Sequence, residues 1–438
     1  MIPYGKLASS TGTDIMGMIR HPQPATHTTS KTDDDGKLRK FEDVAKCVVQ
    51  NVKTSYMIKD RIMYARSQQR PHRPPICGGQ PITPEIATAL RVLVFGGCAT
   101  PPRGEWLRTG LVFRESEKDL AYGLRAPRNG TRGLLSALQA YILKYLLFER
   151  KNERKLSADE LLKPNKCDQT DALWKALSDI LWKIGEKKKA VIALPQEKAY
   201  VPHSIAYFQD SVTEKLHIFE ISEEEELQIF LKRYIYIFQD EPGPGSLLLL
   251  YSAVLTRGIK KVKSDFIDEK QHLVMSSEEG SQCIVMLLLT GRASSFLHNG
   301  VVYVGDEDHY AKAHFGVLTR SEIGFLFYEE DMGERAPGSR LKTPSLPIWV
   351  VYCLGHFGVI FNTNKELLRN YHAERRFELI YYTCGGSRCQ LIVDTRSNSL
   401  GSSKLDENAP TMMVNLEKLI HTKWEDAHIE WNGSTNVI

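Results

Sequence analysis

Four stretches of the chain repeat apolar residues at intervals of three and four, the spacing of one buried helix face. The first begins at residues 83–85, Thr-Pro-Glu, which supply a capping hydroxyl, a first-turn proline and an acid facing the positive end of the helix dipole. It ends at the glycine pair 96–97. The most regular pattern begins at about residues 131–133 and runs to residue 149. Two further helices are predicted, from about residue 171 to 184 and over residues 282–289.

Short runs rich in Val, Ile, Phe and Tyr predict strands, most of them in the second half of the chain. They cover residues 191–194, 216–219, 301–304, 323–328, 348–352, 357–361, 377–382 and 391–393. Because helices concentrate in the first half and strands in the second, the pattern predicts an α+β fold rather than alternating α/β.

The first 75 residues differ in composition from the rest of the chain. Residues 1–40 are rich in Thr, Ser, His, Pro and Asp. Such a segment cannot bury enough apolar surface to offset its ordering entropy, so we predict that it is disordered. Residues 41–66 show some helical spacing, but a polar, proline-bearing segment follows at residues 67–75. We therefore expect an N-terminal extension over residues 1–75 and one folded domain over residues 76–438.

Composition excludes few classes of protein. The chain has 438 residues, 42% hydrophobic and 25% charged, which is ample material for a large core. A formal net charge of +4 does not require nucleic acid or a membrane as partner, and we expect neither. Two charge runs, Lys187–Lys189 and Glu223–Glu226, are interpreted as solvated surface.

Eight cysteines are scattered along the chain, and no export signal or membrane-spanning run is visible. This pattern favours free thiols in a reducing, intracellular setting, cytoplasmic or nuclear. Cys384 and Cys389 flank two glycines, but a zinc site usually needs a second pair of ligands, and none stands at a suitable spacing. We expect no metal and no cofactor. The sequence makes no prediction of oligomeric state.

One helix and one histidine follow the chain order of a papain-like cysteine protease. Such enzymes place the nucleophile at the first turn of a central helix, where backbone N–H groups and the positive helix end stabilise a thiolate. A histidine from a later strand serves as the general base. Here the helix predicted over residues 133–149 follows a turn at residues 126–132, and His356 opens a predicted strand.

Whole segments make this likeness specific. They are residues 82–95 with 105–106, 120–124, 126–140, 287–293, 321–326, 341–351 leading into His356, 422–424 and 429–433. In this order they resemble the longer-chain subfamily of the MINDY deubiquitinases, which are ubiquitin carboxyl-terminal hydrolases. The resemblance implies a papain-like catalytic domain. It also implies that ubiquitin or polyubiquitin, often of the proteasome-targeting linkage, is the partner.

The chain departs from that family where the chemistry takes place. The slot of the nucleophilic cysteine holds Arg132, the preceding proline slot holds Thr131, and the slot of the glutamine that helps form the oxyanion hole holds Ala126. The slot of the base holds His356, as in the family. A guanidinium stays protonated and has no nucleophilic lone pair to offer. We therefore interpret the chain as a pseudoenzyme.

The substitutions also carry structural expectations. A cation at a helix N-terminus opposes the dipole, so we expect Arg132 to turn toward solvent or a carboxylate. It would then either obstruct the groove for the ubiquitin tail or pair with a carboxylate terminus. Without a thiol to activate, His356 is expected to be a packed or hydrogen-bonded strand residue.

Three functions stay open at this point. The first is a pseudo-deubiquitinase that binds ubiquitin chains without cleaving them. The second is an active deubiquitinase for the same linkage that uses a relocated cysteine, with Cys98 and Cys353 as candidates; Cys353 is expected to face away from His356 or into the core. The third is a scaffold that has kept the fold but no longer binds ubiquitin.

Overall fold

The computed structural model describes residues 74–432, except for 101, 103, 115–117, 151–155, 269, 306–311 and 397–410. The disorder predicted for residues 1–40 and the helical spacing of residues 41–66 lie outside the described residues. The extent of the N-terminal extension therefore stays a prediction.

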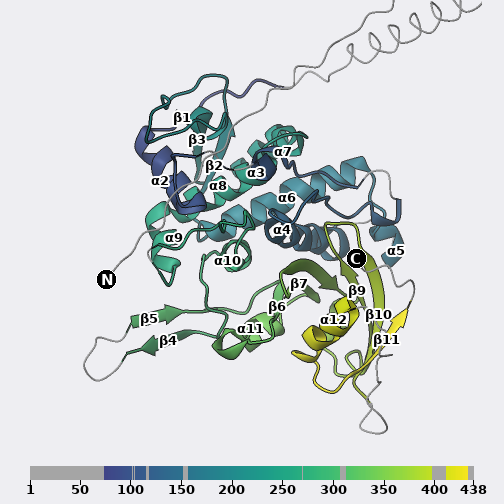
Figure 1. The fold of residues 1–438 in the computed structure, drawn as a ribbon. Helices are drawn as coiled ribbons and strands as arrows, with labels where there is room; N and C mark the ends of the chain where they lie inside the picture. The colour runs from purple at the N-terminus through teal and green to yellow at the C-terminus, as the bar shows by residue number, and fades with distance from the viewer. Residues whose placement is uncertain are drawn as a thin grey trace, which may run out of the picture. The chain divides into compact units, whose positions relative to one another are not determined.

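Helices dominate the first half of the described chain. They are α2 (Pro84–Phe95), α3 (Gly104–Arg108), α4 (Arg132–Lys144), α5 (Ala158–Leu161), α6 (Lys166–Ile184), α7 (Glu224–Gln239), α8 (Gly245–Arg257), α9 (Ile259–Asp265) and α10 (Gln282–Thr290). A π-helical turn over Tyr145–Glu149 extends α4 to the residue at which the sequence pattern ends. Figure 1 shows these helices, coloured blue to teal, gathered on one side of the molecule.

The second half forms a six-stranded sheet in the order β11-β10-β9-β8-β7-β6. Its strands are β6 (Gly324–Tyr328), β7 (Ile348–Cys353), β8 (His356–Phe361), β9 (Arg376–Tyr382), β10 (Arg388–Asp394) and β11 (His428–Asn432). Within this sheet, β6 and β7 pair in parallel and the other described neighbours are antiparallel. Helix α4 packs on one face against β7 and β8, while α11 (Ser339–Lys342) and α12 (Thr411–His421) lie against β6, and α12 also contacts β7.

Alternation along the central strands divides the core into two clusters. In β7, Ile348 and Val350 belong to the large cluster that contains α4, whereas Trp349 and Val351 belong to the smaller cluster beside α12. Residues two apart along a strand face the same side, so one sheet serves both cores. The fold is the predicted α+β class, with the papain-like layout of a central buried helix against a mainly antiparallel sheet.

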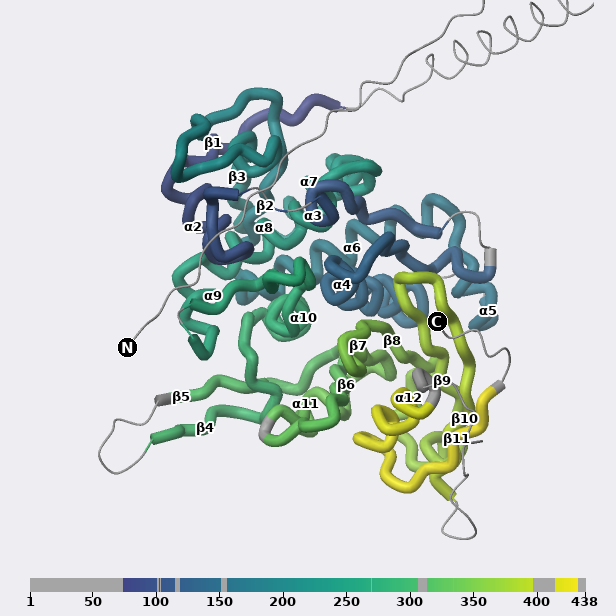
Figure 2. The backbone as a smooth tube through the Cα atoms, in the orientation of Figure 1, coloured from purple at the N-terminus to yellow at the C-terminus, as the bar shows by residue number. Residues whose placement is uncertain are grey.

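Two small sheets complete the described fold. The first has the order β1-β3-β2, with β1 (Gln80–Pro81), β2 (Ala190–Pro195) and β3 (Leu216–Ile221). The second is a two-stranded arm, β4 (Val301–Val304) and β5 (Lys312–Phe315), which extends away from the body in Figure 2. Every residue of β4 is exposed although all four are apolar.

Local signals explain where helices begin and end. The Thr83 hydroxyl accepts a hydrogen bond from the Ile86 N–H, and Gly96 ends α2 in the left-handed conformation at φ 80°. The prediction that the third helix begins near Asp171 was wrong by five residues. Asn165 and Asp168 form a reciprocal capping box, so α6 begins at Lys166. Among the described residues, no helix is long and apolar enough to cross a bilayer.

Candidate active site

A carboxylate holds the turn that leads into α4. Glu105 of α3 accepts hydrogen bonds from the N–H of Gly130 (3.2 Å), the N–H of Thr131 (3.0 Å) and the Thr131 hydroxyl (3.1 Å). A methyl group on Gly130 would lie 2.6 Å from the carboxylate oxygen and 2.8 Å from the backbone carbonyl oxygen of Glu278, so the turn leaves no room for a side chain here. An internal acid therefore faces the positive end of α4.

Helix α4 is fixed against the sheet and against the preceding segment. A methyl group added to Gly133 would lie 3.1 Å from the Phe357 ring, so the first turn of the helix lies directly on β8. The Gln139 side chain accepts from the Leu124 N–H at 2.6 Å and donates to the Tyr122 carbonyl at 2.9 Å. The helix and the segment before its turn are thus tied together.

Arg132 is the first residue of α4 and is half-buried. Its guanidinium lies against the turn between β9 and β10, because Nη2 is 2.9 Å from the place that a methyl group on Gly385 would take. Its Nε is buried and has no hydrogen-bond partner within the described part of the chain. Arg132 was expected to turn toward solvent or a carboxylate: among the described residues no carboxylate pairs with it, and the side chain is partly exposed. The bare backbone of Gly385 leaves the room that the side chain fills.

Ala126 is buried in the segment before the turn. Its N–H donates to the Cys384 carbonyl at 2.8 Å, and the same carbonyl accepts from Arg114 at 2.9 Å. The methyl side chain of Ala126 cannot donate to an oxyanion. Burial raises the pKa of the Cys384 thiol to about 12, although Ser136 and two arginines oppose the shift.

His356 is the first residue of β8 and follows a tight turn in which Leu354 (φ 46°) and Gly355 (φ 88°) are both left-handed. The side chain is exposed, and no hydrogen bond or ion pair joins it to another described residue. The expectation of a packed or hydrogen-bonded histidine was therefore wrong. The hairpin turn places position 356 at the rim of the sheet, where the strand leaves the core.

The pairing of β8 with β9 brings His356 and the Arg132 guanidinium to the same end of the sheet. Val359 pairs with Tyr382 across the antiparallel strands β8 and β9. His356 stands three residues before Val359 and Gly385 three residues after Tyr382, so both lie beyond this pair at the same end. The Arg132 guanidinium lies against Gly385 at that end. The arrangement is that of a cysteine-protease fold in which an arginine opens the central helix.

The two cysteines proposed as relocated nucleophiles are buried. Cys98 has its Sγ 3.6 Å from the Thr88 carbonyl, and burial raises the pKa of its thiol, although Arg91 opposes this. Cys353 donates to the Asn415 carbonyl at 3.5 Å, and burial raises its pKa to about 11. As expected, Cys353 faces the core, although it pairs directly with His356 across β7 and β8. Both thiols are protonated at neutral pH.

A cavity of about 250 Å³ adjoins the N-terminal end of α4, lined in part by Asn129, Met275, Tyr352 and Phe357. A larger cavity, about 660 Å³, includes Lys144 at the other end of the same helix. Sequence reasoning missed both cavities, because each gathers side chains from several distant segments.

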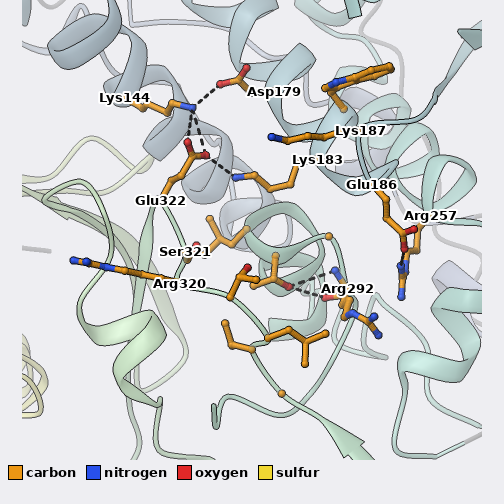
Figure 3. A pocket seen from close by; sticks show the side chains of 18 of the residues that line it. Lys144, Asp179, Lys183, Glu186, Lys187, Arg257, Arg292, Arg320, Ser321 and Glu322 are labelled. Atoms are coloured by element: carbon orange, nitrogen blue, oxygen red, sulfur yellow. Dashed lines mark hydrogen bonds and ion pairs between the residues drawn. The ribbon is translucent and has the colours of Figure 1, made fainter. Parts of the chain in front are cut away.

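The larger cavity is lined by a network of charges (Figure 3). Lys144 contacts Asp179 at 2.8 Å, and Lys183 contacts Glu322 at 2.9 Å. Burial alone would raise the pKa of Glu322, but the charges and hydrogen bonds of Lys183 and Lys144 outweigh it, and the pKa is lowered. Lys144 and Lys183 are thus neutralised by Asp179 and Glu322, and we assign these four residues a structural role.

Comparison with known proteins identifies the family. The family model described as "Deubiquitinating enzyme MINDY-3/4, conserved domain" matches residues 91–433, and the chain belongs to this family. It is 34% identical over 363 residues to the mouse "Probable ubiquitin carboxyl-terminal hydrolase MINDY-4" and 33% identical over 360 residues to the human one. Each match covers 82% of this chain but 47% of the relative, so the chain spans about half the length of these relatives.

A second group of relatives is more distant. The mouse "Ubiquitin carboxyl-terminal hydrolase MINDY-3" is 29% identical over 305 residues, which cover 65% of this chain and 67% of that protein. No solved structure matches the chain. The similarity to both groups of this family supports a ubiquitin-hydrolase-like domain.

Proposed function

We propose that this chain is a pseudo-deubiquitinase, which binds ubiquitin or polyubiquitin of the proteasome-targeting linkage without cleaving it. The observation that carries the proposal is Arg132 at the first residue of α4, where the family resemblance expects the nucleophile. Relatives named as ubiquitin hydrolases support ubiquitin as the partner. Binding and cleavage are separable, because a few anchor residues away from the chemistry carry most binding energy.

The loss of chemistry is large on physical grounds. Removing the nucleophile of such an enzyme costs on the order of a million-fold in rate. Removing one oxyanion donor costs roughly a hundred- to a thousand-fold when the nucleophile is present. The two losses act on one step and do not simply multiply. Arg132 and Ala126 are thus each sufficient to make hydrolysis by the family mechanism very slow.

The alternative of a relocated cysteine is less well supported. Cys98 and Cys353 are both buried, and the pKa of each thiol is raised, so neither provides the thiolate that attack requires. Neither opens the helix that lies against β8.

The alternative of a scaffold without ubiquitin binding is opposed by the exposed apolar arm. Tyr303 of β4 is 70% exposed, its neighbours Val302 and Val304 are 44% and 51% exposed, and Phe315 of β5 is 43% exposed. Contiguous apolar side chains on a monomer surface mark contact sites for other proteins. An apolar arm is complementary to the apolar patch of ubiquitin, and we assign the arm to that contact.

A calorimetric titration of the full chain with tetraubiquitin of the proteasome-targeting linkage tests binding. We expect saturable binding at micromolar affinity or better. Replacing Tyr303 by serine is expected to weaken binding by about ten-fold or more, since exposed tyrosines at interface centres are frequent hot spots. The matched control is Tyr371→Ser, which removes an aromatic side chain that is 77% exposed elsewhere on the surface. No detectable heat from the folded wild-type protein would refute ubiquitin binding.

A further inference from the structure

A third cavity, of about 560 Å³, lies where three segments distant in sequence meet. It is lined by the first turn of α2, by the turn that follows α6, and by the junction of α8 and α9. It contains no residue of the candidate active site. We call it the lysine cavity, after Lys188, Lys189, Lys260 and Lys261, which line it from two of these segments.

Positive charge is concentrated at the lysine cavity. Its lining holds these four lysines and Arg257, against the single carboxylate of Glu186. The excess of four positive charges equals the formal net charge of the entire chain, which is +4. The lysine run at residues 187–189, interpreted above as solvated surface, is indeed exposed, but it lies beside a second basic segment rather than alone.

Arg257 and Glu186 already form ion pairs within the fold. Arg257 donates to both carboxylate oxygens of Asp265, at 3.1 and 3.0 Å, and contacts Glu186 at 3.0 Å. Figure 3 shows Glu186 turned toward Arg257, while Lys187 on the same turn points elsewhere. With Asp265 and Glu220, which lie outside the lining, counted as well as Glu186, three of the five lining cations are paired, and the excess positive charge is left at Lys188 and Lys260.

Two of the four lysines are available to a ligand. Lys189 contacts Glu220 at 2.7 Å and Lys261 contacts Glu186 at 3.5 Å. Lys188 and Lys260 are exposed, and neither has a hydrogen bond or ion pair with another described residue. They belong to different segments, so a ligand that engaged both would span the cavity.

The floor of the cavity is aliphatic. Ile86 from α2, Leu255 from α8 and Ile259 from α9 are each partly exposed there, and Ile184 at the end of α6 is buried beneath them. A partner that carried only charge would leave this surface in contact with water. An aliphatic side chain buried against it would remove apolar surface from water on both partners, which favours binding.

We propose that the lysine cavity binds an acidic peptide segment whose carboxylates contact Lys188 and Lys260 and whose aliphatic side chains cover the floor. Lysine ammonium groups attract phosphates and carboxylates alike, but a polyphosphate has no apolar part to cover Ile86, Leu255 and Ile259. A bilayer surface is broad, whereas a concave cavity of this volume fits a few side chains. Charge and shape together favour the peptide.

The test uses the full chain and a short fluorescein-labelled peptide with glutamates on both sides of a central Leu-Ile pair. Fluorescence anisotropy should show saturable binding that weakens as sodium chloride rises from about 50 to about 300 mM. Lys188→Glu with Lys260→Glu should weaken binding by at least about ten-fold, because the new carboxylates would repel the glutamates of the peptide. Replacing the Leu-Ile pair by two serines should weaken binding to a similar degree, about ten-fold.

Controls separate this site from general charge effects. Lys270→Glu with Lys365→Glu makes the same change in net charge at two exposed lysines outside the cavity, and should leave peptide binding unchanged. Circular dichroism checks that each variant is folded. Equal loss in both double variants, or equal binding of the serine peptide, would overturn the proposal. Binding of inositol hexakisphosphate as tight as that of the peptide would also overturn it. The same holds if vesicles rich in phosphatidylserine capture the chain and the peptide does not bind at all. The proposal does not depend on ubiquitin binding.

Discussion

Arg132→Cys combined with Ala126→Gln is expected to give measurable cleavage of tetraubiquitin of the proteasome-targeting linkage, whereas the wild-type chain gives none. The cysteine would open α4 beside Phe357, at the end of the sheet where His356 begins β8. Because His356 is exposed and makes no hydrogen bond with another described residue, it is free to take a proton from the new thiol. Cleavage is measured by gel densitometry over a time course.

Single variants show how much of the lost activity is due to the missing nucleophile and how much to the missing oxyanion donor. Arg132→Cys alone should cleave roughly a hundred- to a thousand-fold more slowly than the double variant, because it lacks the oxyanion donor. Ala126→Gln alone should be inert, since it has no nucleophile. Adding His356→Ala to the double variant should abolish the regained activity. A folded double variant that binds tetraubiquitin but cuts nothing would show that more of the cleft has changed than these two slots.

Arg91→Met is expected to lower the free energy of unfolding by about 3 to 5 kcal/mol, because it leaves a carboxylate buried without its cation. Arg91 of α2 contacts Asp210 at 2.9 Å, and neither side chain is exposed to solvent. The arginine also donates to the carbonyls of Phe208 and Thr100, so one side chain ties α2 to two loops. Urea denaturation followed by tryptophan fluorescence measures the difference.

The matched control for that variant is an exposed ion pair. Lys189 contacts Glu220 at 2.7 Å, but the two side chains are 48% and 59% exposed. Lys189→Met should therefore change the free energy of unfolding by less than about 1 kcal/mol. If Arg91→Met lowered the free energy of unfolding no more than Lys189→Met does, burial would not explain the contribution of the Arg91–Asp210 pair, and our description of that contact would be wrong.

The sequence predicts the core elements well where local signals agree with packing. Every residue of α4 from Gly133 to Lys144 is buried, and the three- and four-residue spacing identified this helix. The predicted strands of the six-stranded sheet are confirmed to within a few residues, because their β-branched and aromatic runs are bounded by turns. The fold class is confirmed on the same grounds.

The missed elements had weak or misleading local signals. The acidic run Glu223–Glu226 was interpreted only as surface, yet Glu224–Glu226 form the first turn of α7, where acids suit the helix dipole. Helix α8 is buried almost all round like α4, but its four consecutive leucines at residues 247–250 hide the three- and four-residue spacing by which α4 was identified.

The candidate site divides in the same way. The slots of Arg132, Ala126 and His356 follow from family blocks in the sequence, and their functional roles stay predictions. The direction of the Arg132 side chain could not be predicted, because it depends on Gly385, which is distant in sequence and is brought beside it by the sheet. The meeting of Lys188 with Lys260 is likewise invisible in sequence, since tertiary packing alone joins the two segments.

The central claim of the proposed function is that the chain binds ubiquitin and that no cysteine of its described residues is placed to attack it. A ubiquitin bearing a cysteine-reactive group at its C-terminus, incubated with the full wild-type chain and followed by intact mass spectrometry, tests this most directly. We predict no covalent adduct from the wild type, and an adduct at position 132 from the Arg132→Cys, Ala126→Gln variant. An adduct on the wild type that Cys353→Ser or Cys98→Ser removes would contradict the account and show an active enzyme with a relocated nucleophile.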